Sequence, residues 1–200
     1  MAARYLPKIL LTLTIMSGWG VFSVNAAEPL QVNARKQPAD YVNPFVGTTN
    51  FGTTNPGAVC PNGMMSVSPF NVMGSDENVW DKDSRWWSTP YCYENKFFTG
   101  YSHVNLSGVG CPELGSLLTM PTSGELEVDY HKYGSEYSGE QAVPGWYSNT
   151  LTRYGIRTEV SATERTSIER YTFRAGQANI LINLGEPCNI AKEVFLLWSQ

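Results

Sequence analysis

Polar and apolar residues alternate over short segments along most of the chain after residue 63, and no segment keeps an apolar period of 3.6 residues. Alternation with a period of two is typical of strands that bury one face. The clearest pair of segments flanks Tyr154-Gly155, whose glycine suits a hairpin turn. Strands are predicted over residues 64–70, 116–120, 124–130, 146–153, 156–162, 166–174 and 178–184. Short strands separated by turn residues predict an all-β fold, an antiparallel β-sandwich.

A long polar segment without periodicity, residues 71–96, interrupts this pattern. It contains Trp80, Trp86 and Trp87, and three large aromatic side chains in a polar loop cannot all face the core. Segments of this length without periodicity inside a domain more often have a function than serve only as connections. We expect at least one of these tryptophans to form a platform for the apolar face of a sugar or for a neighbouring domain.

The stretch from Phe98 to Pro121 combines glycines with directional polar side chains. Gly108, Gly110 and Gly115 permit positive φ or a close approach of the backbone. The polar side chains beside them are His103, Asn105, Ser107 and Glu113. This combination suits a site for a polar, neutral ligand. The alternative is a tight corner whose polar side chains satisfy their own backbone.

The N-terminal residues 1–26 have the three parts of a secretory signal peptide. Arg4 and Lys8 supply the positive start, residues 9–16 form an apolar core too short to span a bilayer, and Ala26 ends a run of small residues. We expect cleavage after Ala26, export to the periplasm or the extracellular space, and a flexible leader over residues 27–39.

Charge and composition restrict the partners. Loss of Arg4 and Lys8 changes the formal net charge from −4 to −6, and the chain has no Lys/Arg cluster and no second long apolar segment. Nucleic acid and, after signal cleavage, a membrane are therefore excluded as expected partners. The 6 Trp and 11 Tyr instead favour sugars or peptides. The four cysteines, Cys60, Cys92, Cys111 and Cys188, permit disulfides in an exported protein, with free thiols as the alternative, and their wide spacing does not suggest zinc.

Several segments carry a resemblance to a known family. The segments are YVNPFVGT at 41–48, TNPGAVCPNGMMSVSP at 54–69, GYSHVNLSGVGC at 100–111, LLTMPTSG at 117–124, YGIRTEVSAT at 154–163 and RYTF at 170–173. In this order they resemble the N-terminal domain of glycoside hydrolase family 92, secreted bacterial exo-α-mannosidases. The resemblance covers residues 40–186.

The resemblance implies a β-sandwich that packs on a larger helical (α/α)₆ catalytic domain, which is absent from this chain. It implies a calcium-dependent, inverting enzyme that removes terminal α-mannose, commonly α-1,2-linked, from mannans or N-glycans. In the family the two catalytic carboxylates and the main calcium ligands come from the helical domain, so we assign no catalytic and no metal-binding residue here. The residues expected to contact the mannose-containing glycan, or to brace that wall of the site, are Trp87, Trp86, Asn55, His103, Asn105 and Ser107.

Residues 187–200 depart from the family pattern, and we expect them to form a divergent tail that does not continue the sandwich. A chain that ends on the apolar run VFLLWSQ is expected to be cut short. Two other interpretations stay open. The chain could be a freestanding carbohydrate-binding module, or it could be a non-functional gene fragment that exposes its strand edges.

Overall fold

The computed structural model describes residues 36–49, 52–72, 89–105, 115, 117–184 and 195–199, all within the compact unit Lys36–Gln200. For Tyr130 and for residues 195–199 it describes the backbone alone. The described helical segments are a 3₁₀ helix, η1 (Pro38–Tyr41), and a single turn of α-helix, α1 (Tyr130–Tyr133).

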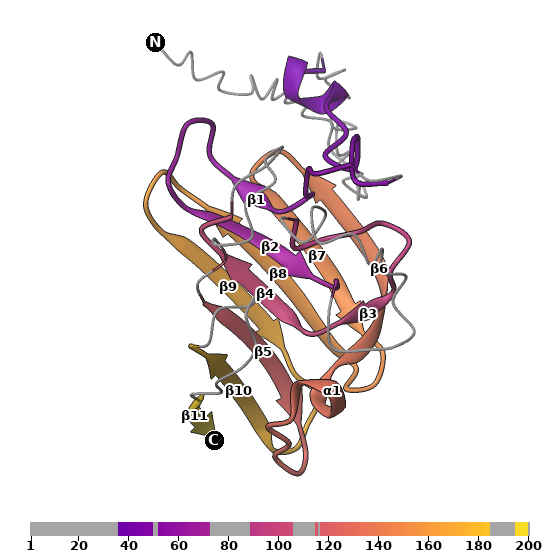
Figure 1. Ribbon diagram of the computed structural model, residues 1–200, viewed down its shortest axis with the longest axis vertical. Helices are drawn as coiled ribbons and strands as arrows, with labels where there is room; N and C mark the ends of the chain where they lie inside the picture. The colour runs from indigo at the N-terminus through magenta and orange to yellow at the C-terminus, as the bar shows by residue number, and fades with distance from the viewer. Residues whose placement is uncertain are drawn as a thin grey trace, which may run out of the picture. The chain divides into compact units, whose positions relative to one another are not determined.

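Two antiparallel sheets make up the fold (Figure 1). The six-stranded sheet has the order β1 (Ala58–Val59), β2 (Ser66–Phe70), β4 (Gly100–His103), β5 (Leu118–Ser123), β10 (Ala178–Asn183) and β11 (Phe195–Ser199). The five-stranded sheet has the order β3 (Phe97–Phe98), β6 (Ser135–Val143), β7 (Trp146–Leu151), β8 (Ile156–Ala162) and β9 (Ser167–Thr172). The prediction of an all-β antiparallel sandwich is confirmed.

The core lies between the two sheets and is rich in tyrosine. Fully buried side chains from the six-stranded sheet include Tyr101 and Met120, and those from the five-stranded sheet include Tyr147 and Ile156. The rings of Tyr101 and Tyr147 meet edge to face across the interface, with centroids 6.1 Å apart. Because each buried tyrosine also carries a hydroxyl, this core requires polar partners in its interior.

The strands with regular alternation were placed correctly by the sequence. The predicted segments 156–162, 166–174 and 178–184 correspond to β8, β9 and β10, and the predicted hairpin is the β7–β8 pair. The segment predicted as a strand over residues 124–130 is instead exposed coil that leads into α1. Gly124 there has a φ of +87°, and the Asp129 side chain accepts a hydrogen bond from the backbone N–H of His131, which caps the helix.

The C-terminal strand differs from the expectation of a tail outside the sandwich. Residues 195–199 form β11, which pairs antiparallel with β10 over five residue pairs, from Asn179 opposite Ser199 to Asn183 opposite Phe195. The apolar run FLLWS supplies residues with a high strand propensity. Without β11, the backbone N–H and C=O groups at the outer edge of β10 would be unpaired.

Candidate functional site

Asn55 lies in the loop that leads into β1. Its Oδ1 accepts a hydrogen bond from the backbone N–H of Gly57 at 3.2 Å, which closes a local turn. Among the described residues, none accepts a hydrogen bond from its side-chain NH₂. Asn55 itself is half-buried.

Strand pairing brings the Asn55 loop close to His103. Val67 of β2 pairs with Ala58 of β1 on one side and with His103 of β4 on the other. Since neighbouring strands lie about 4.8 Å apart, the beginning of β1 and the end of β4 are roughly 10 Å apart. Two of the predicted site segments, far apart in the sequence, therefore share one end of the six-stranded sheet.

His103 spans the two sheets through a buried ion pair with Glu169 of β9. The side chains of His103 and Glu169 are 7% and 13% exposed. His103 Nδ1 lies 2.9 Å from the Leu117 carbonyl oxygen, and Nε2 contacts a carboxylate oxygen of Glu169. Both ring nitrogens face acceptors, so the imidazolium, in which both nitrogens donate, is the form that satisfies both contacts. Neither nitrogen is left for a ligand while this pair is intact.

The pair shifts both pKa values. Burial lowers the pKa of His103, but the hydrogen bond and negative charge of Glu169 and the Leu117 carbonyl outweigh burial and leave this pKa above its ordinary value. Burial raises the pKa of Glu169, and the hydrogen bonds from His103, Tyr171 and Thr119 together leave it below its ordinary value. Thr119 Oγ1 donates to Glu169 Oε2 at 2.7 Å, and the Tyr171 hydroxyl donates to the same oxygen. The carboxylate is thus fully satisfied within the protein.

Asn105 holds the chain as it leaves β4. Its Nδ2 donates to the Ser102 carbonyl oxygen at 2.8 Å, and its Oδ1 accepts from the Ser102 hydroxyl at 2.9 Å. The backbone N–H of Asn105 donates to Ser66 Oγ at 2.7 Å. Between His103 and Asn105, Val104 has a φ of +57°, a strained conformation for a β-branched residue. Such strain is retained where the surroundings enforce it, and it concentrates at functional sites.

The described ends of the tryptophan-rich segment form hydrogen bonds with each other and with the chain beside Asn55. The Asn71 N–H donates to the Pro90 carbonyl oxygen at 3.0 Å, and the Asn71 side chain exchanges hydrogen bonds with the backbone of Cys92 at 2.8 and 2.9 Å. The Thr89 hydroxyl donates to the Thr54 carbonyl oxygen at 3.4 Å, next to Asn55. Trp86 and Trp87 lie outside the described residues, as do Trp80, Ser107, Gly108, Gly110, Cys111, Glu113 and Cys188, so statements about them stay predictions. Cys60 and Cys92 are free thiols.

A second polar cluster centres on Glu140 of β6, which the sequence patterns did not single out. Between Ser138 and Gln141 the register with β7 shifts, and Gly139 has a φ of +62°, so β6 contains a bulge. The extra residue places Glu140, rather than Gly139, on the inner side of the sheet. The buried hydroxyls of Tyr91 and Tyr147 both donate to Glu140 Oε1, at 2.8 and 2.7 Å. A glycine inside a strand is the signal that could have revealed this bulge.

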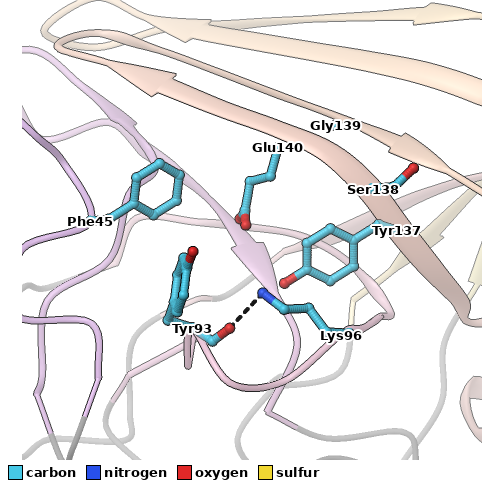
Figure 2. A pocket seen from close by; sticks show the side chains of 7 residues that line it. All are labelled: Phe45, Tyr93, Lys96, Tyr137, Ser138, Gly139 and Glu140. Atoms are coloured by element: carbon cyan, nitrogen blue, oxygen red, sulfur yellow. Dashed lines mark hydrogen bonds between the residues drawn. The ribbon is translucent and has the colours of Figure 1, made fainter.

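Glu140 also lines a pocket of about 260 Å³ (Figure 2). The other lining residues are Phe45, Tyr93, Lys96, Tyr137, Ser138 and Gly139. The rings of Phe45 and Tyr93 meet at 70° with centroids 5.8 Å apart. Lys96 Nζ donates to the Tyr93 carbonyl oxygen at 2.6 Å and lies 4.3 Å from the centre of the Tyr93 ring. Lys96 of the pocket lining immediately precedes β3 in the sequence, and His103 is the last residue of β4. The Glu140 cluster and the His103 cluster therefore lie at opposite ends of the β3–β4 segment.

Neither a metal centre nor a membrane span is found in the described part of the chain. No group of three or more His, Cys, Asp or Glu residues there is arranged to hold a metal ion. The family resemblance implies that the main calcium ligands lie in the helical domain rather than among these residues, and no step is assigned to calcium here. No helix among the described residues is long and apolar enough to cross a bilayer.

Comparisons with known proteins agree with the fold and the motifs. Residues 41–194 match the glycosyl hydrolase family 92 N-terminal domain. A family GH92 α-mannosidase from Bacteroides thetaiotaomicron, solved in complex with mannoimidazole, is 32% identical with a TM-score of 0.65, over 74% of this chain and 20% of that chain. An inverting GH92 mannosidase from the same species is 26% identical with a TM-score of 0.55, over 74% and 20%.

A curated relative from Arthroderma benhamiae, described as an uncharacterized secreted glycosidase, is 30% identical over 142 residues, which are 66% of this chain and 17% of that protein. The chain thus spans about a fifth of the length of these relatives. The family match covers the Asn55 loop, the β4 motif and the tryptophan-rich segment together. The chain belongs to glycosyl hydrolase family 92, and residues 41–194 are its N-terminal domain.

Proposed function

We propose that this chain supplies the N-terminal, active-site-lining domain of an exported, calcium-dependent, inverting exo-α-mannosidase that removes terminal α-mannose, commonly α-1,2-linked, from mannans or N-glycans. The observation that carries the proposal is the 32% identity, over 74% of this chain, to an α-mannosidase whose structure holds mannoimidazole. The catalytic acid, the catalytic base and the calcium ligands of such an enzyme would lie in the part of its length that this chain does not span.

The state of the described carboxylates supports that division of labour. Inversion needs a carboxylic acid and a carboxylate about 6.5–9.5 Å apart with room for a water between them. Glu169, beside the candidate residues, is neutralised by His103, and Glu159 on the neighbouring strand lies 2.6 Å from Arg170. Because each is engaged by a basic side chain, Glu169 and Glu159 are poorly suited to protonate a leaving group or to activate water, which supports a binding and orienting role for the residues around them.

Each candidate residue has a role in this proposal. Trp87, or its neighbour Trp86, stacks on the sugar in the leaving-group position. The open amide of Asn55 donates to a sugar hydroxyl, and Ser107 contributes a hydroxyl contact. The ion pair of His103 and the loop contacts of Asn105 brace the wall that carries these groups.

The proposal is tested by mannose release from α-1,2-mannobiose, with the longest gene product that carries this chain compared with the 200-residue chain alone. The longer product should release mannose, the first anomer seen by NMR should be β because the reaction inverts, and EDTA should abolish the release. The 200-residue chain should release none. Absence of release from every α-linked mannoside by the longer product would refute the substrate class, and release by the chain alone would refute the division of labour.

Replacement of Trp87 by alanine tests the stacking role in the same assay. We expect Trp87→Ala to lower kcat/KM about tenfold, because it removes an aromatic platform from the substrate, while the unfolding transition stays unchanged. Ile168→Ala is the control, since Ile168 is 70% exposed on the outer side of β9 and should leave turnover unchanged. Unchanged kinetics in Trp87→Ala would remove this residue from the site.

A further inference from the structure

We propose that the pocket around Glu140 binds one pyranose ring of a neutral glycan, as a second sugar site separate from the Asn55–His103 end of the domain. The pocket has a volume of about 260 Å³, which suits a single sugar ring. Three features of its lining lead to this ligand class.

The first feature is an oriented acceptor that the described residues leave open. Tyr91 and Tyr147 both donate to Glu140 Oε1, and among the described residues no donor reaches Glu140 Oε2. Burial raises the pKa of both tyrosines, so both hydroxyls keep their protons and continue to donate. Figure 2 shows the Glu140 carboxylate pointing into the space between Phe45 and Tyr93 on one side and Tyr137 and Lys96 on the other. A fixed carboxylate with one open oxygen is suited to accept from a ligand hydroxyl.

The second feature is the balance of charge. Lys96 Nζ faces the same pocket, and within the described residues no ion pair joins Lys96 to Glu140. A cationic ligand would meet the Lys96 ammonium, and an anionic ligand would meet the Glu140 carboxylate. A neutral polyol avoids both repulsions, because its hydroxyls donate to Glu140 and accept from Lys96.

The third feature is an apolar corner beside these polar groups. The rings of Phe45 and Tyr93, held at 70° to each other, offer aromatic surface to the C–H face of a pyranose. Hydrogen bonds anchor the backbone of both residues. Asn43 Oδ1 accepts from the backbone N–H of Phe45 at 3.0 Å, and the Tyr93 N–H donates to the Thr48 carbonyl oxygen at 3.0 Å. The backbone of the corner is therefore preformed, so binding would require ordering of the two side chains alone.

The test is titration of the 200-residue chain with methyl α-mannopyranoside, followed by the amide signals of Tyr93, Lys96 and Gly139 in NMR spectra. Methylammonium and acetate are the charged probes. The glycoside should shift these signals saturably, and neither charged probe should. No saturable shift with the glycoside, or equal shifts with either ion, would overturn the proposal. Mannose release is not a readout, so the result does not depend on the proposed hydrolytic function.

Two substitutions and a matched control sharpen the test. Tyr93→Ala should weaken glycoside binding about tenfold, and because Tyr93 is 44% exposed the fold should persist. Tyr41→Ala is the matched control, because Tyr41 is 72% exposed and lies outside the pocket lining. Like Tyr93, Tyr41 has a lysine ammonium over its ring: Lys36 Nζ lies 5.5 Å from the ring centre. Glu140→Gln should weaken glycoside binding and admit acetate, since only the Lys96 charge remains. Equal losses in Tyr93→Ala and Tyr41→Ala, or unchanged binding in Glu140→Gln, would contradict the site.

Discussion

Glu169 and Glu140 are both carboxylates directed inward from the five-stranded sheet, yet their surroundings differ. Glu169 meets an imidazolium and two hydroxyls, and both of its oxygens accept hydrogen bonds from protein donors. Glu140 receives two tyrosine hydroxyls on one oxygen, and its other oxygen faces a pocket. The first acid has its counter-charge within hydrogen-bond reach, and the second does not.

This difference separates a structural carboxylate from one that can bind. A buried ion pair recovers its desolvation cost only when geometry and additional hydrogen bonds are good, and the His103–Glu169 pair meets that condition across the interface between the sheets. Glu140, which is held by neutral donors, has one oxygen that no donor among the described residues reaches. Substitutions around each of the two acids test this contrast.

The largest expected effect follows from removal of the cation beside Glu169. His103→Leu leaves a carboxylate that is 13% exposed without its partner, and the free energy of unfolding should fall by about 3–5 kcal/mol in chemical denaturation. Arg170→Met is the control, because the Arg170 side chain is 71% exposed and its pair with Glu159 should contribute less than about 1 kcal/mol. Equal losses in the two variants would show that the buried pair contributes no more than an exposed one.

The same pair predicts a pH window for stability. The folded pKa of His103 is raised, so its contribution is complete below the unfolded value of 6.5 and is lost as pH rises through the folded value. The folded pKa of Glu169 is lowered, so its contribution is present above the unfolded value of 4.5 and is lost as pH falls through the folded value. The pair is thus most stabilising between pH 4.5 and 6.5, and Tm should decline on both sides.

Histidine variants identify the source of the alkaline decline. His103→Gln should flatten the fall in Tm above pH 6.5, whereas His131→Gln, at the other histidine of the chain, should keep it. A decline that persists in His103→Gln would assign the pH dependence to other groups.

The contrast also shows what the sequence could reveal. The regular strands β8, β9 and β10 were predictable because their alternation is unbroken, and His103 was singled out because it lies in a family motif. Its partner Glu169 is 66 residues away, and a pairing across two sheets leaves no local pattern. Strand β6 was missed because its bulge disrupts the period of two and because its sequence, SEYSGEQAV, has few apolar residues. With β6 missed, Glu140 and its pocket could not be predicted.

A smaller change in stability than that of His103→Leu is expected from the bulge, and it can be separated from the change in binding. Gly139 has a φ of +62°, so backbone strain in Gly139→Ala should lower the free energy of unfolding by about 1–2 kcal/mol. The new Cβ would have free space, because its nearest neighbour would be Thr150 Oγ1 at 3.9 Å. Gly124→Ala is matched, since Gly124 has a φ of +87° and a Cβ added there would meet no atom within 4 Å. Both variants should lose similar stability in urea denaturation. Only Gly139→Ala should weaken binding of methyl α-mannopyranoside, because only the strain at residue 139 acts on the backbone that positions the Glu140 side chain. Equal binding in the two variants would mean that the bulge does not position the open carboxylate oxygen, and the contrast between the two acids would then rest on the tyrosine hydroxyls alone.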